Sequence, residues 1–205
     1  MRSLHELIRH LTDSSGVLKE PRVIEAFESV DRADFVPEAY RENAYDDAPL
    51  PIGHGQTISQ PTTVAFMLEL LGPLPGQKVL DVGCGSGWTT ALLAHIVGTE
   101  GKIIGVERIP ELVALGRENL AKYDLPQADI RRAGEVLGVP SEVPFDRILV
   151  SAAANDVPQE LLDQLTTLGI AVLPVRHDIL RIRRRDDGTF EEETYEGFVF
   201  VPLIA

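Results

Sequence analysis

The sequence predicts an α/β fold in which a doubly wound, largely parallel sheet carries helices on both faces and ends in an antiparallel C-terminal hairpin. Three observations lead to this prediction. Strand-like and helix-like apolar patterns alternate from residue 78 to residue 175. A glycine-rich turn joins the first strand of that series to its first helix, and two strand-like segments follow one another near the C-terminal end. With 205 residues, the chain suits a single domain with one sizeable core.

The N-terminal region, residues 1–77, predicts helices and one long loop. We expect helices at residues 3–13, 20–30 and 61–71. In the second of these, Val23, Ile24 and Phe27 recur at helical spacing after Pro21. The intervening residues 31–58 are rich in Pro, Gly, Asp and Asn, and loops of this length are usually functional. We therefore expect this loop to bind the substrate.

The central region, residues 78–175, predicts a ligand-binding α/β core. We expect strands at residues 78–82, 102–107, 128–132, 146–150 and 169–175, with helices at residues 87–97, 110–122 and 157–167. Strands that alternate with helices in this way form a parallel sheet that is covered on both faces.

The C-terminal region, residues 176–205, predicts an antiparallel strand pair over residues 178–185 and 190–202. Its first strand contains Arg181, Arg183, Arg184 and Arg185, a turn signal follows at residues 186–188, and the second strand begins with acidic residues at 191–193. We interpret this as a hairpin whose basic and acidic side chains face each other. The alternative, a patch that binds RNA, is disfavoured by a net charge of −13.

Composition favours a cytoplasmic protein that binds neither nucleic acid nor membranes, and we expect a monomer. No apolar run reaches the ~18 residues that span a bilayer, and the N-terminal residues lack the apolar stretch of a signal peptide. Cys84 is the only cysteine, which excludes an intramolecular disulfide and favours a reducing compartment. Ligand spacings typical of metal sites are absent, so we expect no metal.

The glycine turn indicates the kind of ligand. Glycines at 83, 85 and 87 give the spacing G-x-G-x-G, whereas a dinucleotide fingerprint would place its third glycine at position 88, which is Trp. Asp81, just before the turn, would repel a pyrophosphate but could anchor a cationic amino-acid group. Glu107 ends the next strand, where an acid can accept hydrogen bonds from ribose hydroxyls. The simpler alternative is a glycine turn that binds no ligand.

This pattern resembles the first motif of S-adenosylmethionine-dependent methyltransferases, whose sheet is Rossmann-like. It implies S-adenosylmethionine as the methyl donor and Asp81, Gly83, Gly85, Gly87 and Glu107 as cofactor-binding residues. Cys84 lies within the turn and is expected at the cofactor as a packing residue, and Arg108 follows Glu107 and is expected to contact the cofactor.

A second resemblance concerns the acceptor. Residues 56–61 read Gln-Thr-Ile-Ser-Gln-Pro and are similar to a signature of the protein-L-isoaspartate O-methyltransferase family. Residues 31–37 match its Asp-Arg-x-x-Phe-Val-Pro element, residues 145–154 and 157–165 its fourth strand and following helix, and residues 200–203 its C-terminal signature. The similarity runs from about residue 20 to the end. It implies a single methyltransferase domain that methylates isoaspartyl carboxylates in damaged proteins and peptides and so initiates their repair.

The resemblance also implies site residues. Thr57, Ile58 and Ser59 would bind the substrate, and Ser59 would take part in catalysis. Two segments depart from the family pattern. Residues 62–64 read Thr-Thr-Val where many members have histidines, and residues 133–135 read Ala-Gly-Glu where Gly-Asp-Gly is common. Gly134 and Glu135 are therefore expected near the adenine, where Glu135 takes the role of the usual Asp from one position away; the alternative is that this contact is lost.

The acceptor chemistry needs no general base, because a carboxylate with a pKa near 3.5–4 is ionised at neutral pH. Ser59 and Thr57 can orient it by donating hydrogen bonds without neutralising it. Ser59 could instead only cap the helix at residue 61, and His54 could instead be a base, although a carboxylate gives a base nothing to do. A methyltransferase with another acceptor and a non-catalytic binding module are the alternative functions.

Overall fold

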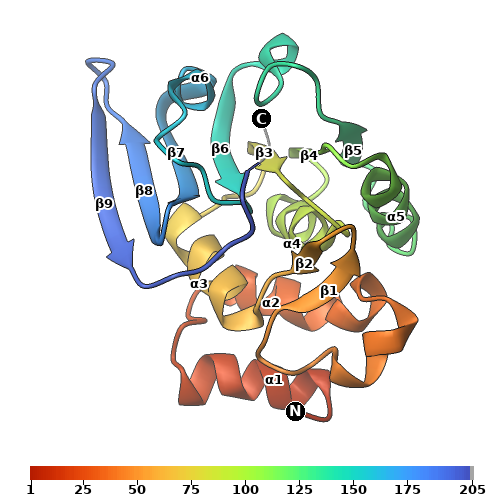
Figure 1. Ribbon diagram of the computed structural model, residues 1–205. Coiled ribbons are helices and arrows are strands. Elements are labelled where there is room, and N and C mark those ends of the chain that lie inside the picture. Colours follow the sequence, from red (N-terminus) through yellow and green to blue (C-terminus); the bar gives the residue numbers. More distant parts are fainter. Residues whose placement is uncertain (204–205) are drawn as a thin grey trace.

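The computed structural model describes residues 1–203 and contains a seven-stranded sheet with the order β5-β4-β3-β6-β7-β8-β9 (Figure 1). The strands are β3 (Lys78–Val82), β4 (Lys102–Glu107), β5 (Ala128–Arg132), β6 (Phe145–Val150), β7 (Leu165–Val175), β8 (Asp178–Arg184) and β9 (Phe190–Glu196). The first five in this order are parallel, and β8 and β9 are antiparallel to their neighbours. The doubly wound α/β prediction is confirmed.

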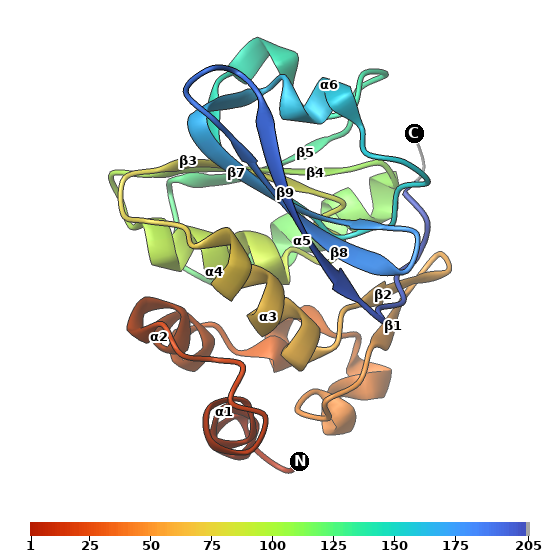
Figure 2. The same cartoon turned by 90° about the vertical axis from the view of Figure 1, so that its left-hand side faces the viewer.

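Helices cover both faces of the sheet. α3 (Pro61–Leu71), α4 (Trp88–Val97) and α5 (Pro110–Leu120) lie on one face, and the short α6 (Gln159–Leu162) lies on the other (Figure 2). Beneath the first face lie α1 (Leu4–Arg9), which continues as a π-helical turn (His10–Ser14), and α2 (Pro21–Ser29). The N-terminal helices therefore form a further layer beneath the helices of that face.

Apolar side chains on both faces of the sheet explain why β3 and β4 lie in its interior. Successive residues such as Val79 and Leu80 are fully buried in two different core clusters, one on each face of the sheet. Ile103 and Ile104 repeat the arrangement on β4. Parallel strands with both faces covered read as continuous apolar runs for this reason.

The predicted helix at 157–167 is wrong over most of its length. α6 spans only Gln159–Leu162, and β7 already begins at Leu165, earlier than the predicted residue 169. Just after the helix, the Gln164 side chain accepts from the N–H of Val139 at 2.8 Å and donates to the carbonyl of Leu137 at 2.8 Å. Leucines at helical spacing thus serve a short helix and then a strand.

The segment at residues 31–58 contains more structure than the predicted loop. Two 3-10 helices, Arg32–Phe35 and Glu38–Asn43, precede a small antiparallel hairpin of β1 (Leu50–Gly53) and β2 (Gln56–Ile58). The hairpin lies beside the carboxyl ends of the central strands (Figure 1). The segment predicted to bind the substrate is therefore held in place and adjoins the edge at which ligands bind in doubly wound folds.

The C-terminal strand pair is confirmed, although β9 ends at Glu196 instead of continuing to 202. Arg181 pairs with Glu193 at 2.5 Å and Arg185 with Glu191 at 3.5 Å across the strands, as the hairpin interpretation predicts. The remaining residues return across the sheet, where Ala153 donates to the carbonyl of Val201 at 2.8 Å. Within residues 1–203, none of the helices is long and apolar enough to cross a membrane.

Candidate active site

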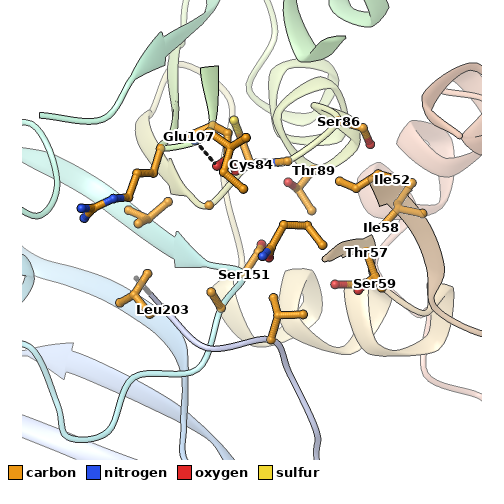
Figure 3. A pocket seen from close by; sticks show the side chains of 18 of the residues that line it. Ile52, Thr57, Ile58, Ser59, Cys84, Ser86, Thr89, Glu107, Ser151 and Leu203 are labelled. Atoms are coloured by element: carbon orange, nitrogen blue, oxygen red, sulfur yellow. Dashed lines mark hydrogen bonds between the residues drawn. The ribbon is translucent and has the colours of Figure 1, made fainter. Parts of the chain in front are cut away.

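A cavity lies at the carboxyl ends of β3, β4 and β6 (Figure 3). It lies where β3 is flanked by β4 on one side and β6 on the other, which is the point at which the winding direction of the sheet reverses. Its walls come from the β1–β2 hairpin, the glycine turn, the end of β4, the end of β6 and the C-terminal segment.

The glycine turn forms the floor of the cavity. Gly83 and Gly85 line it with φ of 74° and 52°, a region that favours glycine. A Cβ on Gly85 would lie 3.1 Å from Cδ1 of Ile52 in the hairpin above, so the turn and the hairpin are already in close contact. Two N–H bonds to the carbonyl of Val106, from Gly83 at 2.8 Å and Cys84 at 3.2 Å, attach the turn to β4.

Gly87 serves packing, and it is not among the residues that line the cavity. A Cβ there would lie 2.9 Å from Cδ1 of Ile130 and 3.1 Å from the carbonyl oxygen of Gly116 in α5. Its φ of 90° would also strain any other residue. The third glycine therefore allows α4 to begin close to α5 and to Ile130 of β5.

Glu107 lies at the end of β4 and joins the turn to the cavity wall. Its carboxylate accepts from the N–H of Gly85 at 3.1 Å and from that of Ile109 at 2.9 Å. The side chain is largely buried and still lines the cavity. A carboxylate has about four lone-pair sites, so two remain for hydroxyl donors of a ligand.

Asp81 lies below the turn, fully buried, and is not among the lining residues. Its Oδ2 accepts from the hydroxyls of Thr89 and Thr90, both at 2.7 Å, and its Oδ1 has no hydrogen-bond partner among the described residues. Burial raises the pKa of Asp81 to about 6, the two hydroxyls oppose that shift, and nearby Glu107 adds to it. An unpartnered buried carboxylate oxygen suits a site that receives a cationic ligand.

Cys84 lines the cavity but is a packing residue, as the sequence predicts. Its side chain is buried and free, and burial next to Asp81 and Glu107 raises the pKa of the thiol well above its ordinary value. A thiol that stays protonated is a poor nucleophile.

Thr57, Ile58 and Ser59 form the wall opposite Glu107 (Figure 3). Ser59 does not cap α3: Gln60 is the capping residue, and it makes no side-chain cap bond. Asp47 takes that role by accepting from the N–H of Thr62 at 2.9 Å and from its hydroxyl at 2.7 Å. The capping alternative for Ser59 is therefore wrong, and its hydroxyl has no hydrogen-bond partner within residues 1–203.

The last wall was not predicted as belonging to the site. Ser151 and Ala152 follow β6, and Val201, Pro202 and Leu203 cross over from the C-terminal segment to complete the cavity. Ser151 could have been found, because ligands bind outside the carboxyl ends of such strands. The other missed lining residues, among them Trp88, Thr89 and Ile109, flank the predicted motifs.

Comparisons with known proteins agree with this architecture. Residues 2–205 match the family described as Protein-L-isoaspartate(D-aspartate) O-methyltransferase. A protein named protein-L-isoaspartate O-methyltransferase from Methanopyrus kandleri is 46% identical over 208 residues, which cover 99% of this chain and 92% of that protein. One of the same name from Aeropyrum pernix is 46% identical over 200 residues, which cover 93% of this chain and 75% of that protein.

A crystal structure of a family protein from Plasmodium falciparum in complex with S-adenosyl-L-homocysteine is similar with a TM-score of 0.88 and 25% identity, and the match covers 100% of this chain and 99% of that one. The chain belongs to the protein-L-isoaspartate O-methyltransferase family. It is thus an S-adenosylmethionine-dependent methyltransferase of isoaspartyl carboxyl groups in damaged proteins. Among residues 1–203, no group of three or more His, Cys, Asp and Glu side chains could hold a metal ion.

The two departures from the family pattern have different structural consequences. Gly134 and Glu135 are exposed and are not among the lining residues, so the structure does not bring them to the cavity; Ala133 is the residue of that segment that lines it. Arg108 is exposed and does line the cavity. Where other members have histidines, Thr62 bonds to Asp47 and Val64 lines the cavity as a buried apolar residue.

Proposed function

We propose that the two walls of this cavity bind different reactants. The glycine turn and Glu107 hold the methyl donor, and Thr57 to Ser59 hold the isoaspartyl carboxylate. S-adenosylmethionine supplies a sulfonium methyl group, which passes to a carboxylate oxygen to give a methyl ester. The observation that carries the proposal is the hydroxyl of Ser59, which lines the cavity opposite Glu107 without a partner in the described chain.

The donor side fits the groups that such a cofactor presents. Glu107 already accepts two backbone N–H bonds, which hold its carboxylate in place, and its remaining lone pairs can accept from ribose hydroxyls. Gly83 and Gly85 allow close approach of a ligand to the backbone. The unpartnered Oδ1 of Asp81 supports an electrostatic role toward the ligand's ammonium group. Arg108 lines the mouth and is proposed to contact the same ligand.

The acceptor side orients an ionised carboxylate and needs no base. Hydroxyls of Ser59 and Thr57 can donate to one carboxylate oxygen and leave the other free to react. His54 is exposed at the tip of the β1–β2 hairpin and is not among the lining residues. Orientation and exclusion of water are therefore the chemical contributions that these residues can make.

All three regions of the chain contribute to the cavity, which supports one functional domain over residues 1–205. Residues 1–77 provide the acceptor wall, the core of residues 78–175 provides the donor site, and the C-terminal region 176–205 provides the residues that close it. The monomeric state stays a prediction of the sequence. The cytoplasmic location and the absence of a nucleic-acid partner stay predictions of the sequence.

The test is methyl incorporation into paired peptides that differ only in isoaspartyl or aspartyl linkage. We expect transfer to the isoaspartyl peptide alone, with release of S-adenosylhomocysteine in equal amount. Equal methylation of both peptides would favour a methyltransferase of another acceptor specificity. Cofactor binding without any transfer would favour the non-catalytic module.

A further inference from the structure

Arg32 is a fully buried arginine whose side chain ties the acceptor segment together. Its Nη1 donates to the carbonyls of Ala44 at 2.7 Å and Asp46 at 3.2 Å. Its Nη2 donates to those of Ala48 at 2.9 Å and Ser59 at 3.1 Å. The first three carbonyls precede the β1–β2 hairpin and the fourth follows it, so one guanidinium holds both ends of the hairpin.

The same guanidinium also contacts the donor side of the site. Its Cζ lies 5.4 Å from the ring centroid of Trp88, which follows the glycine turn, begins α4 and lines the cavity. Phe27 of α2 packs against that ring in an edge arrangement with centroids 5.5 Å apart. Arg32 therefore bridges two elements, the acceptor segment that ends in Ser59 and the helix that carries the turn.

Arg32 does not itself line the cavity, so it does not bind the reactants. Burial lowers its pKa to about 10, which leaves the guanidinium charged at neutral pH, and four carbonyls and a ring face surround the charge. Its planar fork can bond several carbonyls at fixed angles, which the point charge of a lysine cannot do.

We propose that Arg32 is a positioning residue for methyl transfer: it sets the distance between Ser59 and the glycine turn, and with it the alignment of the carboxylate with the methyl donor. This inference rests on the proposed role of Ser59. Misplacing a reacting group by about 1 Å can lower a rate about a hundredfold. The loss of Arg32 should therefore reduce the rate through Ser59, without removing any contact to the reactants.

The test is a double-mutant cycle between Arg32→Lys and Ser59→Ala, with kcat/KM for an isoaspartyl peptide as the readout and S-adenosylhomocysteine affinity measured by calorimetry. We expect Arg32→Lys to lower kcat/KM about tenfold to a hundredfold with little change in that affinity. In the Ser59→Ala background, adding Arg32→Lys should change kcat/KM by less than about twofold. Both substitutions disrupt the same function, the orientation of the carboxylate by Ser59.

Arg147→Lys is the matched control. Arg147 is also a buried arginine that bonds backbone carbonyls, those of Leu71 and Asp146, both at 2.8 Å, but it lies at the opposite end of β6 from the cavity. The substitution Arg147→Lys should lower the melting temperature and leave kcat/KM unchanged. Arg32→Gln, which keeps two N–H donors, repeats the cycle, and all variants are assayed below their lowest melting temperature.

Three results would overturn the inference. Folded Arg32 variants could keep full kcat/KM, or they could lose cofactor affinity in proportion to the loss of rate. In the third case, the fold-losses in kcat/KM of the Arg32 variant and Ser59→Ala would multiply in the double variant, as they do for independent sites. In each of these cases Ser59→Ala alone would still lower the rate, so the proposed function would survive. An unchanged kcat/KM in Ser59→Ala would instead remove the proposed role of Ser59, and the inference with it.

Discussion

The carboxylate of Glu107 accepts a hydrogen bond from the backbone N–H of Gly85 at 3.1 Å, which joins the end of β4 to the glycine turn after β3. The two predicted halves of the cofactor site are thus one structural unit. A buried carboxylate that is held by backbone donors keeps its orientation before any ligand arrives, and preorganisation of this kind lowers the free-energy cost of binding.

Glu107→Ala should weaken S-adenosylhomocysteine binding by roughly 1.5–3 kcal/mol, the range for hydrogen bonds to charged groups, or about tenfold to 150-fold. The mutation removes the acceptor for ribose hydroxyls and also the partner of the Gly85 N–H. Calorimetry measures the change, with exposed Glu100→Ala as a control that should bind normally. Unchanged affinity in the Glu107 variant would refute the ribose assignment.

Gly85→Val should abolish cofactor binding. Its φ of 52° is unfavourable for a β-branched residue, and even the first added carbon would lie 3.1 Å from Ile52 above it. Gly98→Val is the matched control, because Gly98 has a φ of 67° with open space around it. The control should lower the melting temperature and keep affinity. If Gly85→Val bound normally, the turn would not be the binding site.

The fold was predictable where packing imposes a period on the sequence. The parallel strands are buried on both faces, so β3 and β4 appear as short apolar runs between turns. The error at residues 157–167 arose because Leu161, Leu162 and Leu165 suit a helix face as well as a buried strand end. At this point the Gln164 side chain bonds to residues 25 and 27 positions earlier, and no local pattern reveals such contacts.

The site was also predictable only where it depends on local sequence. The glycine turn and Glu107 lie at the ends of predicted strands. Asp47, by contrast, caps α3 although it lies 15 residues before Thr62, outside the reach of any local capping rule. The C-terminal residues 201–203 are held at the cavity by the backbone bonds that Ala153 makes with Val201 and Leu203. Contacts of this kind depend on the assembled sheet and not on spacing along the chain.

Ser59→Ala should lower kcat/KM for the isoaspartyl peptide about 5- to 150-fold, because one orienting donor is worth roughly 1–3 kcal/mol in the transition state. Affinity for S-adenosylhomocysteine should change little, since Ser59 lies on the wall opposite Glu107. Exposed Ser14→Ala, in the N-terminal helical layer, is the control and should be fully active.

Methyl transfer at saturating cofactor should be independent of pH from about 6 to 8, because the acceptor carboxylate is ionised throughout that range. The rate is measured with an isoaspartyl peptide at constant ionic strength. A rate that rises with a midpoint near 6.5 would indicate a histidine base such as His54. It would contradict the mechanism in which the site only orients an existing nucleophile.

Asp81 should make cofactor affinity depend on pH below about 6. Burial raises the pKa of its carboxyl to about 6, so in the free enzyme the group is ionised at pH 7.5 and increasingly protonated as the pH falls. The ligand's ammonium group favours the ionised form, so its binding must displace that proton in acid. S-adenosylhomocysteine affinity should therefore fall by up to about tenfold per pH unit below 6 and level off above 7.

Asp81→Asn separates this electrostatic role from a purely structural one. The amide keeps the shape of the side chain and an acceptor for Thr89 and Thr90, but it carries no charge at any pH. At pH 7.5 it should bind S-adenosylhomocysteine more weakly, because the electrostatic attraction between the carboxylate and the ligand's ammonium group is lost. Its affinity should be constant from about pH 5 to 7.5, because the titrating group has been removed. If instead the wild-type enzyme showed the same flat profile as Asp81→Asn, Asp81 would only support the turn, and its unpartnered Oδ1 would have no role in holding the ligand.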